Sequence, residues 1–127
     1  MEQIVVAKVA RYHRGAPPSK AHPSYASLAK PVRDQVRRLS AILRLADGLD
    51  RGHISAVDRV KVRWLKDRIR ITPIARNIHQ PMRLEIWGAS RKSQLLEKIA
   101  GAPVEIVGSR MAHTVAALTD RAARSPT

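Results

Sequence analysis

The spacing of apolar residues changes near residue 56, and no other feature restricts the fold as strongly. Before this point, apolar residues recur at every third or fourth position, at Val32, Val36, Leu39, Leu43 and Ala46. This is the period of an amphipathic helix. Within residues 57–64, polar and apolar residues instead alternate one by one from Arg59 to Trp64, which is the period of a strand. The chain is therefore predicted to have an α+β fold, with a helical first half followed by a small sheet.

Residues 1–55 are expected to form the helical unit. One helix is predicted over 3–13. A long second helix is predicted from Pro31 to Gly48 or Gly52, because proline suits the first position of a helix. Between the two helices, three prolines and a glycine remove backbone donors and restrict φ, which predicts a loop.

Residues 56–107 are expected to form a small α+β module. Strands with short connections predict an antiparallel meander over 57–64, 68–72 and 82–87. A helix then follows, with Ser90 as its N-cap and Gly101 at its end, and a last strand covers 104–107. The predicted order of elements is β-β-β-α-β. Residues 108–127 are predicted to be a partly helical C-terminal tail.

The charge balance points to anionic partners. The chain has 24 Lys and Arg against 10 Asp and Glu, a net charge of +14 that is spread over both halves. A field of this size concentrates polyanions at a protein surface. The alternative is that the charge serves only to keep the protein soluble. Aromatic residues are scarce, because the chain has two Trp, two Tyr and no Phe. Proteins that bind single-stranded nucleic acid stack bases on aromatic side chains, so this composition argues against that class.

The chain carries no sequence signal for export. It contains no Cys, so it offers no disulfide and no thiolate metal site. The first residues lack the charged start and long apolar stretch of a signal peptide, and no window approaches the roughly 18 apolar residues of a membrane span. A cytoplasmic protein without membrane contact is therefore expected.

Asp47 and Asp50 are the candidates for acid–base or metal chemistry. They lie three residues apart at the end of the long helix, so both fall on one side of it. Such carboxylates can help to hold a divalent metal such as Mg²⁺ or Mn²⁺, or they can pair with Arg44 and Arg51. No His-Asp doublet, glycine-rich phosphate loop or Cys nucleophile is present. The residues therefore predict no self-contained catalytic site.

The cations of the predicted sheet suggest a binding surface. Alternation places Arg59, Lys61 and Arg63 on one side of the first strand. It also directs apolar side chains inward from the other strands, at Ile69, Ile71, Leu84 and Ile86, and arginines outward, at Arg68, Arg70 and Arg83. The planar guanidinium group fits phosphate oxygens two at a time, so a row of such groups can hold a repeating anion. The alternative is a solvated surface whose cations discourage edge pairing.

Several sequence strings resemble a known family. They are Val9-Ala-Arg-Tyr-His-Arg14, the proline-rich loop to His22-Pro23, Leu43-Arg-Leu-Ala-Asp-Gly-Leu-Asp-Arg51, Leu84-Glu-Ile-Trp87 and Ser90-Arg-Lys-Ser-Gln-Leu-Leu. Over roughly residues 3–107, the chain resembles the C-terminal part of the exopolyphosphatase and guanosine pentaphosphate phosphohydrolase family. In longer members this part follows two actin-like catalytic lobes, helps to hold the polyphosphate chain and forms dimer contacts.

The resemblance implies that residues 1–55 are the remnant of a helical HD-type hydrolase fold. His13 falls where that fold has a late histidine, and Asp47 or Asp50 falls where it has the final aspartate. These three residues are thus the candidate metal ligands. The earlier helices with the His-Asp doublet would precede residue 1, so independent phosphohydrolysis is not expected. Apolar residues of the first helix, at Ile4, Val5 and Val9, would also lack their usual packing partners.

The leading hypothesis is a non-catalytic module that binds polyphosphate or a related phosphate polyanion and assists a separate catalytic chain, or forms a homo-oligomer. Its candidate binding residues are Arg11, Arg14, Arg44, Arg51, Arg59, Lys61, Arg63, Arg68, Arg70 and Arg83. One alternative is a metal-dependent HD-type phosphohydrolase that acts on guanosine tetra- or pentaphosphate or on polyphosphate. Others are a basic accessory protein that binds nucleic acid and a relic fragment without a present function.

Overall fold

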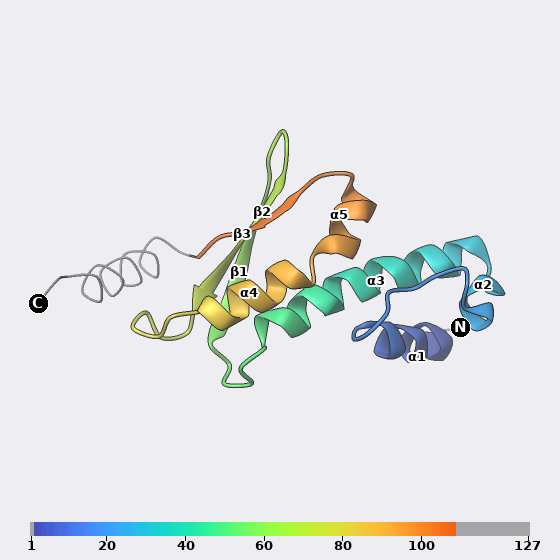
Figure 1. The fold of residues 1–127 in the computed structure, drawn as a ribbon, viewed down its shortest axis with the longest axis horizontal. Helices are drawn as coiled ribbons and strands as arrows, with labels where there is room; N and C mark the ends of the chain where they lie inside the picture. Colours follow the sequence, from blue (N-terminus) through green and yellow to red (C-terminus); the bar gives the residue numbers. More distant parts are fainter. Residues whose placement is uncertain (1, 109–127) are drawn as a thin grey trace, which may run out of the picture.

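The computed structural model describes residues 2–108 and confirms an α+β fold in which helices precede a small sheet. Figure 1 shows α3 as the long central helix, with α1 and α2 near one end and α4 and the sheet near the other. The elements in chain order are α1 (Glu2–Tyr12), α2 (Pro23–Ala26), α3 (Lys30–Leu49), β1 (Val57–Trp64), β2 (Ile69–Ala75), α4 (Arg83–Arg91), α5 (Gln94–Ala100) and β3 (Val104–Ile106). The tail helix predicted within 108–127 lies outside the described residues from 109 onward.

The first two helices and the start of α3 enclose a small apolar core. It consists of Val5, Tyr12, Tyr25 and Val36. The Tyr12 ring stacks on the ring of His22, and the Tyr12 hydroxyl lies 2.9 Å from His22 Nδ1. Aromatic stacking and this hydrogen bond hold the proline-rich loop against α1. The sequence prediction of a helix, a proline-rich loop and a second helix is therefore confirmed.

The outer faces of α1 and α3 remain apolar and exposed. Val6, Ile42 and Leu39 are among the exposed large apolar side chains, and they border a shallow groove between the two helices. Ile4 is also exposed, whereas Val5 is buried. The expectation that α1 lacks packing partners thus fits Ile4 and does not fit Val5.

The sheet has three strands in the order β1-β2-β3, and it is mixed. β1 and β2 are antiparallel and are joined by a short connection at Lys66 and Asp67, whereas β3 runs parallel to β2. The prediction of a third antiparallel strand over 82–87 is wrong, because these residues begin α4. The observed order is therefore β-β-α-α-β.

The misassigned strand has a clear physical cause. Met82, Glu85 and Ala89 are buried, and their spacing of three and four is that of one helix face. Leu84, which was expected to point inward, is 48% exposed, and Ile86 is half-buried. Three alternating apolar residues also fit a short helix, so periodicity alone does not distinguish the two structures.

The helix that follows begins later than predicted. Ser90 lies inside α4 and donates a hydrogen bond to the Ile86 carbonyl oxygen, so it is not an N-cap. Ser93 precedes α5 in that position. The predicted end at Gly101 is confirmed, since its φ of 68° is a left-handed conformation that glycine adopts without a steric penalty.

The second core lies between the helices and one face of the sheet. Leu45 and Leu49 of α3 pack with Ile69 and Ile71 of β2 and with Ala89 of α4. Because α3 contributes to both cores, the helical part and the sheet part share it. The opposite face of the sheet is not covered by any described element and carries the side chains of alternate residues on β1 and β2. Within residues 2–108, no helix combines the length and apolar character needed to cross a bilayer.

Helices α3 and α4 meet at a pair of glycines. A Cβ atom on Gly48 would lie 2.5 Å from the Gly88 carbonyl oxygen, and one on Gly88 would lie 2.6 Å from the Gly48 carbonyl oxygen. Neither distance is compatible with a side chain, and backbone cannot move aside as a flexible side chain can. The two helices therefore approach this closely only because both positions are glycine.

We predict that Gly88→Ala destabilises the fold by about 1–3 kcal/mol, the usual cost of inserting a methyl group into a packed contact. The direction of the change is diagnostic, because at an uncrowded helix position the same substitution would stabilise the helix by about 1 kcal/mol. Urea unfolding followed by circular dichroism measures the change. Gln35→Ala, at an exposed position of α3, is the control and should leave stability within about 0.5 kcal/mol. An unchanged or increased stability of Gly88→Ala would contradict this account of the helix contact.

Candidate anion-binding groove

A groove lies where the end of α3 meets α4. It has a volume of about 290 Å³ and is lined by Asp47, Gly48, Arg51, Trp87, Gly88, Arg91 and Lys92. An adjoining pocket of about 200 Å³ is lined by Arg14, Asp47, Arg51, His53 and Lys92. The two hollows share three lining residues, so they form one continuous groove. We call this combined surface the α3–α4 groove.

Helical geometry places the groove on the side of α4 that faces away from the sheet. Ala89 is fully buried against the sheet core. Trp87 and Arg91 are four residues apart and lie on the same face of α4, roughly opposite Ala89. The glycine pair lies at the floor of the groove, where it allows the two helices to approach.

Trp87 organises two of the cations. The guanidinium carbon of Arg91 lies 5.0 Å from the centroid of the Trp87 ring, and that of Arg51 lies 5.9 Å from a Trp87 ring centroid. A cation over an aromatic face is attracted by the negative charge of that face. The indole thereby draws guanidinium groups from two different segments toward the same groove.

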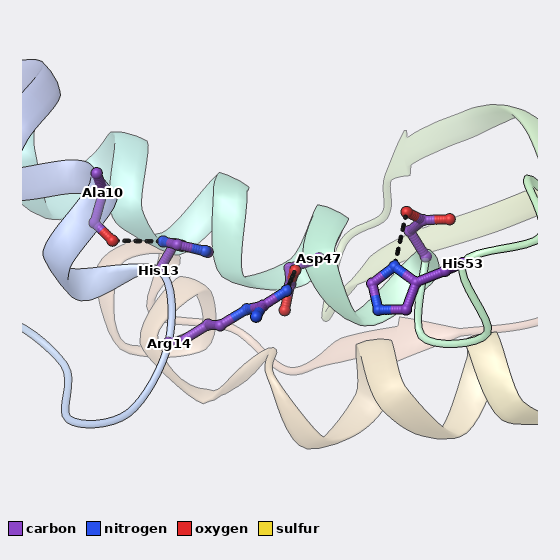
Figure 2. Close-up of polar contacts among 6 residues, drawn as sticks. Ala10, His13, Arg14, Asp47 and His53 are labelled. Carbon is purple, nitrogen blue, oxygen red and sulfur yellow. Dashed lines mark hydrogen bonds and ion pairs between the residues drawn. The ribbon is translucent and has the colours of Figure 1, made fainter.

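Among residues 2–108, Asp47 is the single carboxylate that lines the groove, and it is already paired. Arg14 Nη2 donates a hydrogen bond to Asp47 Oδ1 at 3.0 Å, and Figure 2 shows Arg14 reaching from the end of α1 toward α3. This hydrogen bond is the main reason why the pKa of Asp47 is lowered, and the nearby positive charges add to the effect. Within the described residues, Arg51, Arg91 and Lys92 form no ion pair with a carboxylate, although Lys92 lies near enough to Asp47 to lower its pKa. The groove is therefore strongly positive, which suits an anion.

The three candidate metal ligands do not converge. His13 Nδ1 contacts the Ala10 carbonyl oxygen, Asp47 pairs with Arg14, and Asp50 lies 3.6 Å from His53 (Figure 2). No group of three His, Cys, Asp or Glu side chains within residues 2–108 is placed to hold a metal ion. Cations also line the pocket beside Asp47, and they oppose a divalent cation there. The donor set thus does not fit Mg²⁺ or Mn²⁺.

The predicted anion-binding residues fall in separate places. Arg14 and Arg51 line the α3–α4 groove. Arg44 is structural, because its Nη1 donates to the carbonyl oxygens of Tyr12 and Gly15, each at 2.9 Å. Arg11 lies on α1, donates to Ser24 Oγ at 3.2 Å and contacts the Tyr12 ring. Arg83 is exposed at the start of α4.

The cations of the sheet and its turn divide into two groups. Arg59, Lys61 and Arg63 are exposed on β1 and have no ion pair among residues 2–108. Arg68 and Arg70 instead lie 3.4 Å and 3.1 Å from Glu105 of β3, which neutralises part of their charge. The sequence prediction placed all five on one anionic track, whereas the available cations lie only on the first strand.

Sequence reasoning missed Trp87, Arg91 and Lys92 as site residues. The strand predicted over 82–87 separated Trp87 from the two cations that follow it. The signal was present nonetheless, because Trp87 and Arg91 have the i, i+4 spacing of neighbours on a helix.

No protein-family model matches the chain, and no curated protein shows significant similarity to it. The resemblance to the exopolyphosphatase family therefore depends on the sequence strings alone and stays a prediction.

Asp47→Asn is predicted to strengthen phosphate binding by about two- to fivefold, because it removes the negative charge of the groove and releases Arg14. Titration calorimetry with inorganic tripolyphosphate measures the affinity. Asp34→Asn removes the same charge from the exposed Lys30–Asp34 pair and is the matched control, for which no comparable gain is expected. Weaker binding by Asp47→Asn would contradict the assignment. Loss of Mn²⁺ binding in this variant would favour the metal-site alternative.

The pH dependence of stability gives a second test of the Arg14–Asp47 pair. The folded chain lowers the pKa of Asp47 below its ordinary value of 3.8, so this carboxylate binds its proton less tightly when folded than when unfolded. The pair therefore stabilises the fold above about pH 4, and this contribution is lost as the pH falls through the folded pKa. Urea unfolding should show the native chain slightly more stable than Asp47→Asn at pH 7, with the difference vanishing in acid. A difference independent of pH would contradict this role of the pair.

Proposed function

We propose that this chain is a cytoplasmic module that binds polyphosphate or a related phosphate polyanion and holds it for a separate catalytic chain. One observation carries the proposal. Three cations that form no ion pair among residues 2–108, Arg51, Arg91 and Lys92, line one groove together with Trp87. Such a cluster is unfavourable by itself, because like charges repel. A bound polyanion would relieve this repulsion.

Phosphate fits the groove by its chemistry. Guanidinium groups donate paired hydrogen bonds to phosphate oxygens, and the Lys92 ammonium adds a point charge. Binding along a polyanion releases condensed counterions, which makes the affinity strongly dependent on salt. The net charge of +14 would attract such a ligand from a distance.

The family resemblance supports the same proposal from the sequence. Residues of the strings that carry it pack against one another, since Tyr12 stacks on His22 and Arg44 binds the Tyr12 carbonyl oxygen. Asp47 and Arg51 of a third string line the groove. We therefore propose a relationship to the C-terminal part of the exopolyphosphatase family. The dimer contacts that this relationship implies stay a prediction.

The proposal assigns binding, and no bond cleavage, to the residues of the groove. The HD-type alternative needs ligands that meet at one metal ion, whereas His13, Asp47 and Asp50 each contact a different partner. No specific observation favours nucleic acid over polyphosphate. The experiment below therefore also tests whether the chain prefers nucleic acid.

The test compares two charge-matched double variants. Arg91→Gln with Lys92→Gln removes two groove cations, and Arg38→Gln with Lys98→Gln removes two exposed cations elsewhere. Fluorescence anisotropy with labelled polyphosphate measures the affinity at several salt concentrations. The groove variant should lose about tenfold or more in affinity, because charge-assisted hydrogen bonds contribute about 1.5–3 kcal/mol each. It should also lower the salt slope by about 2.

The control pair should lose far less affinity, since it changes only the overall field. Equal losses in the two variants would mean that charge, and not the groove, determines binding. Affinity that is indifferent to salt would contradict polyanion binding altogether. Preference for duplex DNA with a defined footprint would favour the nucleic-acid alternative.

A further inference from the structure

Strand β1 presents an edge that no other strand within residues 2–108 pairs with. It is eight residues long and lies at one end of the sheet, where β2 is its only neighbour among the described strands. Every residue from 58 to 64 is exposed. The only irregularity in its pairing lies at its start, between Val57 and Arg59, and the strand contains no proline. Bulges, prolines, covering elements and charged side chains normally protect such edges. Beyond Arg59, β1 has only the last of these, and its cations repel basic strands but not acidic ones.

The hydrogen-bonding pattern shows which backbone groups face outward. Ile71 is paired with Val62, yet the Ile71 carbonyl oxygen accepts a hydrogen bond from Val107 N on the opposite side, at 3.0 Å. Val62 and Ile71 are therefore a non-hydrogen-bonded pair. In an antiparallel ladder such pairs alternate with hydrogen-bonded ones. The N–H and C=O groups of Val60, Val62 and Trp64 consequently point to the open edge.

The side chains of β1 are cationic on one face of the sheet and mostly apolar on the other. Arg59, Lys61 and Arg63 project from the uncovered face of the sheet. On the other face, Val60, Val62 and Trp64 are 44%, 59% and 69% exposed, because the core under the helices includes β2 and β3 but reaches β1 only at its first residue, Val57. A strand added at this edge would meet a cationic row on one face and an apolar row on the other.

We propose that the β1 edge binds an extended acidic segment of a partner protein as a fourth strand. Its acidic side chains would lie beside Arg59, Lys61 and Arg63, and its alternate apolar side chains would lie beside Val60, Val62 and Trp64. Main-chain hydrogen bonds supply affinity in this mode of recognition, and alternate side chains supply specificity. The site is separate from the α3–α4 groove and does not depend on phosphate binding there.

Charge complementarity selects the acidic segment over a second copy of this chain. Antiparallel pairing of two β1 edges would bring the two cationic rows side by side on one face. Like charges on neighbouring strands are destabilising, so the row excludes this pairing while it attracts acids.

The test uses the whole chain, labelled with ¹⁵N, and a synthetic ten-residue peptide of alternating Glu and Val. Hydrogen exchange should slow at the amides of Val60, Val62 and Trp64 when the peptide is added. The amides of Lys61 and Arg63 already face β2, so their exchange should change much less. A Lys–Val peptide of the same length is the matched control and should bind at least tenfold more weakly.

Val62→Pro removes one outward N–H and leaves the hydrogen bonds between β1 and β2 in place. It should abolish peptide binding, whereas Val62→Thr, which keeps the N–H, should bind within about threefold of the native chain. Polyphosphate affinity should be unchanged in both variants, so failure of this proposal is distinguishable from failure of the proposed function. If Val62→Pro does not fold, the exchange measurement on the native chain decides the question.

Three results would overturn the proposal. The first is equal binding of the Glu–Val and Lys–Val peptides, or no binding of either. The second is binding without slower exchange at the three outward amides, which would indicate attraction by charge alone. The third is a dimer in sedimentation velocity that the Val62→Pro variant abolishes, which would assign the edge to a second copy.

Discussion

The contact between Gly48 and Gly88 is the constraint on which the rest of the structure depends. Without side chains at these positions, α4 packs against α3 at backbone distance. This approach brings Ala89 into the core with Leu45 and places Trp87 at the outer surface. The same contact therefore closes one face of the sheet and forms the floor of the α3–α4 groove.

The few carboxylates then determine where positive charge remains available. Glu105 lies beside two arginines of the sheet, Asp47 pairs with Arg14, and Asp58 lies 3.7 Å from Arg76. The cations that form no ion pair with a carboxylate among residues 2–108 include two clusters, one in the α3–α4 groove and one along β1. The α3–α4 groove is compact and suits a folded-back or terminal phosphate group, whereas the β1 row is extended and suits a strand.

The sequence predicted some elements well because their signals are local. The period of α3 extends over the whole helix, and polar and apolar residues of β1 alternate from Arg59 to Trp64, so neighbouring residues alone define both elements. The strand predicted over 82–87 was wrong because three alternating apolar residues fit either period. The helix buries Met82, Glu85 and Ala89 and brings Gly88 against Gly48, and these tertiary contacts cannot be read from neighbouring residues. The role of Arg70 also depends on a distant residue, since Glu105 reaches it from a parallel strand. The groove could not be predicted for the same reason, because its cations come from segments that only the fold brings together.

The central claim is that the α3–α4 groove, and not the sheet, binds phosphate. The chain has only two tryptophans, and they report on the two surfaces separately, because Trp87 lines the groove and Trp64 lies at the β1 edge. The decisive measurement follows the two indole N–H resonances by ¹⁵N NMR during titration with inorganic tripolyphosphate. We expect the Trp87 resonance to shift and saturate while that of Trp64 stays in place. A saturating shift of Trp64 with no response from Trp87 would contradict the account.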